Sequence, residues 1–341
     1  MSQDVGVAPE ESGTSDWYRR AAVELAATSD LQVAWARGVA ADDTVIALIN
    51  RLPREHRQPS LIFSVARWLG APAAPWPEFR GFLVAEWPRV EAAARERRTQ
   101  TNEVGRCAPL LVALDRIPGP IALLELGASA GLCLGVDAYS YRFDDGPVIG
   151  EGSPLLECRT TGTGEAPGGI PDIVWRRGID LAPLSIDPGP GENDIDWLEV
   201  LLPPDRPERV ARLRAACATI AADPPEVVAG DALLALPAIA ATAPSGPALV
   251  IVALGTLVYL PPADRTAVLR LAADLGARLV TMEPVTALPA VAARLEALTA
   301  PEPTPYVLAL DAEPLAYVSA HGERLSWLTP VGQPDARPAS S

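Results

Sequence analysis

The sequence contains no lysine, since all 28 basic residues among its 341 are arginine. A chain without lysine has no P-loop lysine, no Schiff-base lysine and no lysine general base. It has only two histidines, His56 and His321, each in polar, turn-like surroundings. We therefore expect neither a histidine-based catalytic triad nor a histidine-rich metal centre.

Cysteine is scarce as well, and its spacing excludes two further classes of site. The four cysteines are scattered without a CxxC pair: Cys107, Cys133, Cys158 and Cys217. This spacing predicts reduced cysteines in the core rather than a disulfide framework or a thiolate metal site. No metal is expected.

Long apolar runs and positive charge are also lacking. No run approaches the roughly 20 apolar residues of a membrane helix, and Met1 to Asp16 lack the pattern of a signal peptide. We therefore expect a cytoplasmic protein without a membrane partner. The formal net charge of −15 repels a phosphate backbone, and acids interleave the one dense arginine run, between Arg95 and Arg106. The expected partner is a small-molecule substrate, not nucleic acid.

The hydrophobic pattern predicts two folded regions between two disordered ends. Residues 1–14 and 331–341 are polar or rich in Pro, Ala and Ser, so we expect them to be disordered. Residues 15–117 show helical spacing throughout and predict an all-helical cap, with a kink at Pro88. Residues 118–330 alternate short apolar runs with helical stretches. That alternation predicts an α/β domain with a mostly parallel sheet and an antiparallel C-terminal hairpin.

Two expectations concern the chain that follows the first strand of this domain, Ile121–Leu126. After the loop Gly127–Gly131, the apolar spacing predicts a helix that runs to about Tyr139. The stretch from Gly146 to Gly169 is rich in loop-forming residues and is expected to hold at most a hairpin.

The turn after the first strand is the candidate ligand loop. Ligands of open parallel sheets bind outside the carboxyl ends of the strands. Gly127 and Gly131 permit a tight turn, while Ala128 and Ser129 keep the loop thin enough for its backbone to approach a ligand. The dinucleotide fingerprint GxGxxG fails here, because Ser129 replaces its second glycine and a leucine replaces its third.

This turn resembles the first motif of class I S-adenosylmethionine (SAM)-dependent methyltransferases, in which an acidic residue, here Glu125, precedes a small-residue loop. The resemblance implies a Rossmann-like methyltransferase sheet that holds SAM. It further implies that Asp180 holds the ribose hydroxyls and that Gly230-Asp231-Ala232 reads the adenine amino group. Asp144 is an alternative for the ribose role. A helix N-cap is the alternative for Asp231.

Four segments together resemble an uncharacterised bacterial family, domain of unknown function 2332: Thr99–Arg106, Glu125–Leu132, Arg177–Leu184 and Val228–Ala232. The resemblance covers nearly the whole chain apart from its ends. It implies a methyltransferase-like fold without an established activity or substrate. Cys133 stands where this family typically has asparagine.

A polar cluster precedes the ligand loop by about twenty residues. In one interpretation Thr101 caps the next helix and Glu103 is a first-turn acid. In the other, Gln100, Asn102 and Glu103 face the substrate. Arg106 then pairs with the methionine carboxylate of the cofactor.

The function that the sequence predicts is methyl transfer from SAM to a small or medium-sized molecule, with the helical region as a lid. Tyr259 and Glu283, each near the end of a strand, are the candidates for substrate contact or proton acceptance. Their alternatives are packing under a loop for Tyr259 and capping at a turn before Pro284 for Glu283. A non-catalytic SAM- or nucleoside-binding regulatory or scaffold protein is the alternative function. An NAD-dependent oxidoreductase ranks third.

Overall fold

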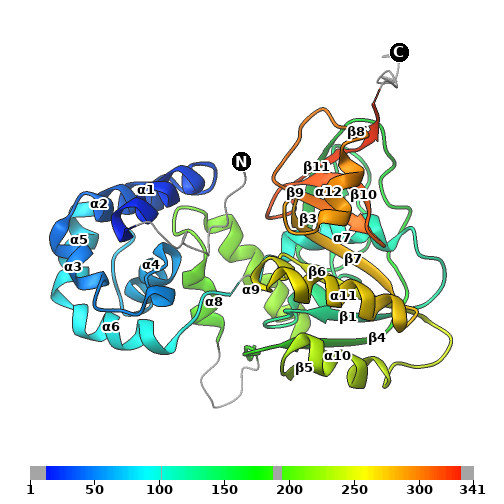
Figure 1. Ribbon diagram of the computed structural model, residues 1–341, viewed down its shortest axis with the longest axis horizontal. Coiled ribbons are helices and arrows are strands. Elements are labelled where there is room, and N and C mark those ends of the chain that lie inside the picture. Colours follow the sequence, from blue (N-terminus) through cyan, green and yellow to red (C-terminus); the bar gives the residue numbers. More distant parts are fainter. Residues whose placement is uncertain (1–12, 101, 187–193, 332–341) are drawn as a thin grey trace. The chain divides into compact units, whose positions relative to one another are not determined.

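The computed structural model describes residues 13–100, 102–186 and 194–331 (Figure 1). They form two compact units, one made of residues 13–100 and 194–214, the other of residues 102–186 and 215–331. The disorder predicted at the two ends, and the predicted cap at Thr101, fall almost wholly outside the described residues. No helix within the described ranges is long and apolar enough to cross a membrane.

The first unit is helical. Its helices are α1 (Thr14–Glu24), α2 (Asp30–Ala40), α3 (Asp43–Ile49), α4 (Pro59–Trp68), α5 (Trp76–Ala85), α6 (Trp87–Glu96) and α8 (Ile195–Leu201), with 3-10 turns η1 (Leu25–Ala27) and η2 (Arg54–His56). The kink predicted at Pro88 is a break between α5 and α6. Pro88 stands in the first turn of α6, where its missing N–H has no partner to lose.

Aromatic side chains fill the core of the helical unit. The rings of Trp35 and Phe79 stack with their centroids 3.9 Å apart, and Phe63 meets Trp35 edge-on at 5.5 Å. All three are fully buried. The indole N–H of Trp35 donates to the backbone carbonyl of Ala74 at 2.8 Å, so the buried ring leaves no polar atom unsatisfied.

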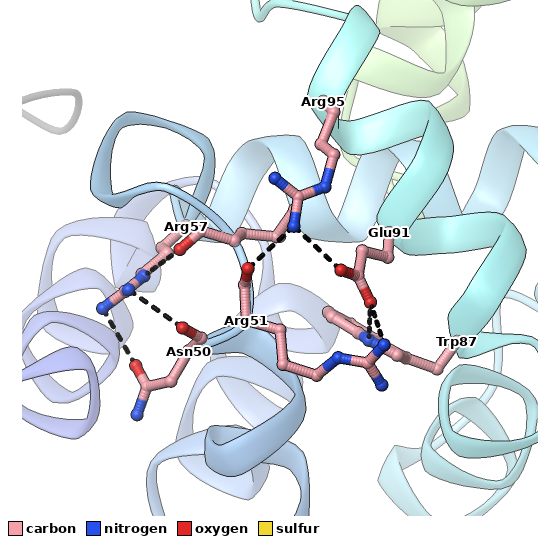
Figure 2. Close-up of polar contacts among 7 residues, drawn as sticks. Asn50, Arg51, Arg57, Trp87, Glu91 and Arg95 are labelled. Atoms are coloured by element: carbon pink, nitrogen blue, oxygen red, sulfur yellow. Dashed lines mark hydrogen bonds and ion pairs between the residues drawn. The ribbon is translucent and has the colours of Figure 1, made fainter.

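A polar network ties the loop after α3 to α6 (Figure 2). The Glu91 carboxylate lies within 2.9 Å of the guanidinium groups of both Arg51 and Arg95, and it accepts the indole N–H of Trp87 at 3.0 Å. Arg95 also donates to the backbone carbonyl of Arg51 at 2.8 Å. One carboxylate therefore joins two segments far apart in the chain.

The second segment of the helical unit docks through charged and polar contacts. Asp205 accepts the hydroxyl of Ser29 at 2.6 Å and the backbone N–H of Leu31 at 3.1 Å, at the start of α2. Arg67 on α4 donates to the carbonyl of Leu202 at 2.9 Å. Residues near 200 are thus part of the packing of residues near 30 and 67.

The second unit is built on a ten-stranded sheet in the order β2-β3-β11-β10-β9-β7-β6-β1-β4-β5. Its strands are β1 (Ile121–Leu126), β2 (Ser140–Phe143), β3 (Leu155–Thr161), β4 (Ile173–Asp180), β5 (Glu226–Ala229), β6 (Ala248–Leu254), β7 (Arg278–Pro284), β9 (Tyr306–Leu310), β10 (Glu313–Val318) and β11 (Arg324–Trp327). Two short strands, β8 (Leu298–Thr299) and β12 (Thr329–Pro330), pair separately.

The helices of this unit are α7 (Cys107–Leu114), the end of α9 (Pro207–Ile220), α10 (Ala232–Ala240), α11 (Pro262–Asp274) and α12 (Pro289–Leu295), with 3-10 turns η3 (Val104–Arg106), η4 (Leu132–Gly135) and η5 (Leu257–Tyr259). Strands β5, β4, β1, β6 and β7 are mutually parallel, and β9, β10 and β11 follow as an antiparallel meander. The prediction of a mixed α/β unit with a mostly parallel sheet and an antiparallel C-terminal hairpin is confirmed.

Every residue of β1 is buried, as its continuous apolar run predicts. Leu124 and Leu126 pack in one cluster with residues of α10, α11 and α12, which lie on the same face of the sheet (Figure 1). Because side chains alternate along a strand, Glu125 lies on the opposite face.

The helix predicted to reach Tyr139 is wrong, because only the four-residue turn η4 forms after the loop. In a continuing helix, the carbonyls of Leu132 and Val136 would accept backbone N–H groups four residues on. Instead the hydroxyl of Tyr139 donates to Leu132 at 2.7 Å, and the hydroxyl of Tyr141 donates to Val136. These two buried tyrosines thus occupy carbonyls that a continuing helix would need, and the chain continues as β2.

The stretch 146–169 holds a strand of the main sheet and not a hairpin. Strand β3 pairs in parallel with β2 on one side and with β11 on the other. Its pattern alternates exposed Leu155 and Glu157 with buried Leu156 and Cys158. Charges on the outer face and flanking Gly and Pro concealed this alternation in the sequence.

Candidate functional site

The candidate site lies where the parallel strands end. The chain places β4 and β5 on one side of β1, then crosses to place β6 and β7 on the other. The strand order therefore reverses between β1 and β6, the position at which ligands of open parallel sheets bind. The loop after β1, the end of β4 and the ends of β6 and β7 share this edge.

Three residues of the loop after β1 have left-handed backbone conformations. The φ angles are 71° at Gly127, 51° at Ser129 and 72° at Gly131. A side chain at Gly127 would place its Cβ 2.4 Å from the hydroxyl of Thr256, so glycine is required there. The left-handed conformation is unfavourable for Ser129, because it is uncommon for residues other than glycine and needs support from the surrounding structure.

The loop bonds first to its own sheet. The N–H groups of Gly127 and Ala128 both donate to the carbonyl of Ile179 on β4, at 2.8 and 3.2 Å. The N–H of Gly131 donates back to the carbonyl of Ala128 at 2.7 Å. Three of the five N–H groups in the loop are thus satisfied by backbone.

Side chains satisfy the other two N–H groups. Asp180 accepts the N–H of Ser129 at 2.8 Å, and the amide oxygen of Asn102 accepts the N–H of Ala130 at 3.1 Å. Asn102 also donates to the hydroxyl of Ser129 at 2.5 Å. All five N–H groups from 127 to 131 therefore bond within the chain, so the loop is a thin, internally satisfied wall and not an anion cradle.

Asp180 supports two turns at once. Its second carboxylate oxygen accepts the N–H of Ala182 at 2.8 Å, so each oxygen has one backbone donor. A carboxylate has about four acceptor sites, which leaves further capacity on both oxygens. Its backbone carbonyl accepts the N–H of Gly230 at 2.9 Å, which joins the ends of β4 and β5.

Asp231 takes the helix N-cap position that was the alternative to adenine binding. Its carboxylate accepts the N–H groups of Leu233 and Leu234, at 2.9 and 3.1 Å, at the start of α10. Asp231 itself is exposed, and Ala232 begins the helix. Asp231 lies at the same edge as Asp180, because β5 pairs in parallel with β4.

Glu125 is a buried carboxyl group behind the loop. Its side chain is only 4% exposed, and its Oε2 has no hydrogen-bond partner among the described residues. Burial raises the pKa of Glu125 well above its usual range, and neighbouring Cys133 acts in the same direction, whereas Arg106 opposes the shift.

Arg106 anchors the segment before α7 to the sheet. Its guanidinium donates to the carbonyl of Ala320 at 2.9 Å and to the carbonyl of Leu254 at the end of β6. It lies against Gly255, whose Cβ would be 2.9 Å from Nη1. Glu103 caps η3 by accepting the N–H of Gly105 at 3.1 Å. Arg106 is buried, and two of its five N–H groups serve the fold.

Glu283 organises the turn that carries Tyr259. Its carboxylate accepts the N–H groups of Thr256 and Leu257 at 2.8 Å, and that of Val258 at 3.2 Å. Burial raises the pKa of Glu283 to about 7, against the lowering effect of these three bonds. Tyr259 is 64% exposed on η5. Glu283 therefore caps the turn after β6 and not a turn before Pro284, and Tyr259 does not pack under a loop.

One candidate, Asp144, is not brought to this edge. Six strands separate β1 from β2, and Asp144 follows β2. Its carboxylate accepts the N–H and the hydroxyl of Thr160, at 2.7 and 2.5 Å. Gln100 belongs to the helical unit. Sequence reasoning missed Thr256, although the rule that selected Asp180, a polar residue at a strand end, also applies to it.

The comparisons with known proteins give one match. A family model described as "Uncharacterized protein conserved in bacteria (DUF2332)" matches residues 14–327. No curated protein matched the chain, and neither did any solved structure.

Proposed function

The chain belongs to this bacterial family, and from its site geometry we propose that it is a SAM-dependent methyltransferase acting on a small or medium-sized molecule. The observation that carries the proposal is the loop whose five N–H groups all bond within the chain at the switch point of the sheet. NAD would need free N–H groups for its pyrophosphate. SAM has no phosphate and needs a thin wall, which this loop provides.

The residues at the edge fit the functional groups of SAM. Asp180 retains acceptor capacity for the two ribose hydroxyls while it supports Ser129. Asp231 retains capacity for an amino group while it caps α10. The buried Oε2 of Glu125 lacks a partner among the described residues, as expected of a polar atom behind a ligand wall. When bound, SAM supplies a methyl group on a sulfonium centre for in-line displacement.

The residues of the chain act by positioning. Asn102 and Asp180 fix Ser129 in its left-handed conformation, which keeps the wall thin. Glu283 holds the turn of Tyr259, the exposed hydroxyl proposed to meet the acceptor. A pKa of about 7 lets Glu283 exist in both protonation states at neutral pH. Methyl transfer needs orientation and a dry site, so a dedicated base is optional.

The decisive test is thermal unfolding with SAM, S-adenosylhomocysteine, NAD or no ligand. A ligand at a hundredfold excess over its Kd stabilises the native state by about 2.7 kcal/mol. We expect a shift with the SAM pair that is lost in Asp180→Asn and retained in Asp144→Asn, its matched control. A larger shift with NAD, or a loss in Asp144→Asn alone, would refute the assignment.

A non-catalytic SAM- or nucleoside-binding protein is the second candidate, because Glu283 is committed to three backbone N–H groups. The two candidates differ in turnover. A methyltransferase releases S-adenosylhomocysteine when a suitable acceptor is present. A regulatory protein binds SAM with the same dependence on Asp180 and releases none with any acceptor in a chemically diverse panel of hydroxyl, amine and thiol compounds.

A further inference from the structure

The sheet unit has a pocket of about 390 Å³ at its far end, around β3 and β11. It is lined by charged and hydroxyl side chains: Asp144, Arg159, Thr161, Glu302, Arg324 and Ser326. Strands β3 and β11 run antiparallel to β1, since three antiparallel pairings separate them from β7. The pocket is therefore distinct from the edge that holds the loop after β1.

Two arginines stand side by side in this pocket. Arg324 on β11 is in register with Arg159 on the parallel strand β3. Paired residues on neighbouring strands project from the same face, and like charges in such a pair repel each other. Within the described ranges, neither guanidinium has a hydrogen bond or an ion pair with another residue. Two cations thus share one pocket with the acids Asp144 and Glu302, and within the described ranges they form no ion pair with either.

Asp144, one of the two acids in the lining, bonds to a neighbouring threonine. Asp144 has a left-handed backbone, with φ of 51°, and directs both carboxylate oxygens to Thr160. Its two bonds to the N–H and the hydroxyl of Thr160 shape the wall of the pocket. Neither Asp144 nor Glu302, the other acid in the lining, forms an ion pair with the arginines within the described ranges.

A hydroxyl pair adds a neutral donor. Thr161 donates to the Oγ of Ser326 at 2.9 Å, and the same Oγ accepts the N–H of Glu302 at 3.0 Å. Two hydroxyl groups carry two hydrogens, and the bond between them uses one. The second hydrogen remains for an acceptor, and Ser326 is almost fully buried, at 2% exposure.

We propose that this pocket binds the oxyanion group, phosphate or carboxylate, of a small molecule. Arg159 and Arg324 supply the charge and the planar N–H donors that oxyanions prefer, and the Thr161–Ser326 pair supplies a hydroxyl hydrogen. The pocket has room for more than the anion itself, since ligand pockets begin at about 300 Å³. The proposal does not depend on SAM binding.

The test is calorimetric titration of the full chain with inorganic phosphate and, separately, with succinate, in sodium chloride of matched ionic strength. Tighter binding of phosphate identifies a phosphate site, and tighter binding of succinate identifies a carboxylate site. Arg159→Gln and Arg324→Gln should each weaken the preferred anion by about tenfold or more, the effect of one charge-assisted contact. The matched control is Arg142→Gln, a neighbouring exposed arginine paired with Glu157 at 3.1 Å outside the pocket lining, and it should leave the Kd unchanged.

Three results would overturn the proposal. One is the absence of binding by both anions, and another is equal weakening in all three variants, which indicates only nonspecific attraction. The third concerns the ligand-free proteins. Each pocket variant relieves repulsion between Arg159 and Arg324, so its thermal midpoint should equal or exceed that of the wild type. A lower midpoint would mean that these arginines serve the fold.

Discussion

The carboxylate of Asp180, at the end of β4, accepts the backbone N–H of Ser129 at 2.8 Å, and Ser129 has a φ of 51°. An acid at the end of β4 thereby holds an unfavourable backbone conformation in the loop that follows the neighbouring strand, β1. The residue that the sequence associates with a ligand is also a structural support of the loop, so the two roles must be separated by experiment.

Asp180→Ala should lower the free energy of unfolding by about 2 kcal/mol, because the N–H groups of Ser129 and Ala182 lose a charged acceptor. Asp180→Asn should cost less, since one amide oxygen can still accept one of them. Urea unfolding without ligand measures both. An alanine variant as stable as the wild type would show that these bonds do not support the loop.

Gly178→Ala should be strongly destabilising and should be rescued by removal of one methyl group. The new Cβ would lie 2.6 Å from the Cβ of Ala128, inside any normal contact distance. Overpacking of this kind costs about 1–3 kcal/mol. Adding Ala128→Gly removes this shortest contact and leaves those with Val227 at 3.1 and 3.2 Å, so the double variant should be more stable than Gly178→Ala alone. Additive losses in urea unfolding would contradict this contact.

Glu283 should make the protein less stable as pH rises from about 4.5 to about 7. Burial raises the pKa of Glu283 from 4.5 to about 7, so the folded state binds the proton more tightly than the unfolded chain. The contribution of this group is complete below pH 4.5 and is lost as pH rises through 7, with a total on the order of 3 kcal/mol.

The matched variant for this effect is Glu283→Gln, which keeps an acceptor for the N–H groups of η5 and cannot titrate. The difference in urea midpoint between wild type and variant should change in favour of the variant as pH rises across that window. A constant difference from pH 4.5 to 8 would contradict a raised pKa.

Glu91 should have the opposite pH dependence. The hydrogen bond from Arg95 is the main cause that lowers the pKa of Glu91. Burial, the second-largest cause, opposes it, and Trp87 and Arg51 add to the lowering (Figure 2). The stabilisation is present above the unfolded pKa and is lost as pH falls through the folded one. Glu91→Gln should therefore be less stable than wild type at neutral pH and approach it in acid. Thermal unfolding followed by tryptophan fluorescence measures this. An equal gap at both pH values would contradict it.

The sequence predicted the elements whose pattern is local. Strands such as Ile121–Leu126 and Ala248–Leu254 lie between turn residues and read as continuous apolar runs, and the structure has them at the same bounds. The break before Pro88 followed from proline chemistry alone. The family match to residues 14–327 likewise agrees with motifs that are contiguous in the chain.

Features that depend on distant contacts or on side-chain bonds to the backbone could not be predicted. The chain does not continue as a helix after Gly135, where Tyr139 and Tyr141 bond to carbonyls seven and five residues earlier, and apolar spacing carries no sign of such bonds. The acceptor of Ala130 is Asn102, some thirty residues earlier, and Arg106 reaches Ala320 near the end of the chain. Strand β3 depends on β11, which pairs with it from more than 150 residues away.

The helical unit contains residues 194–214 as well as residues 13–100, which has a consequence for how the protein is made. A ribosome synthesises the N-terminal helices first. The hydroxyl of Ser29 donates to the carboxylate of Asp205, however, and the guanidinium of Arg67 donates to the carbonyl of Leu202, and both acceptors are synthesised much later. The first helices therefore lack these partners until β1 to β4 have been synthesised. During this interval their docking surface for α8 is uncovered, and it becomes covered only after residues 194–214 have been synthesised.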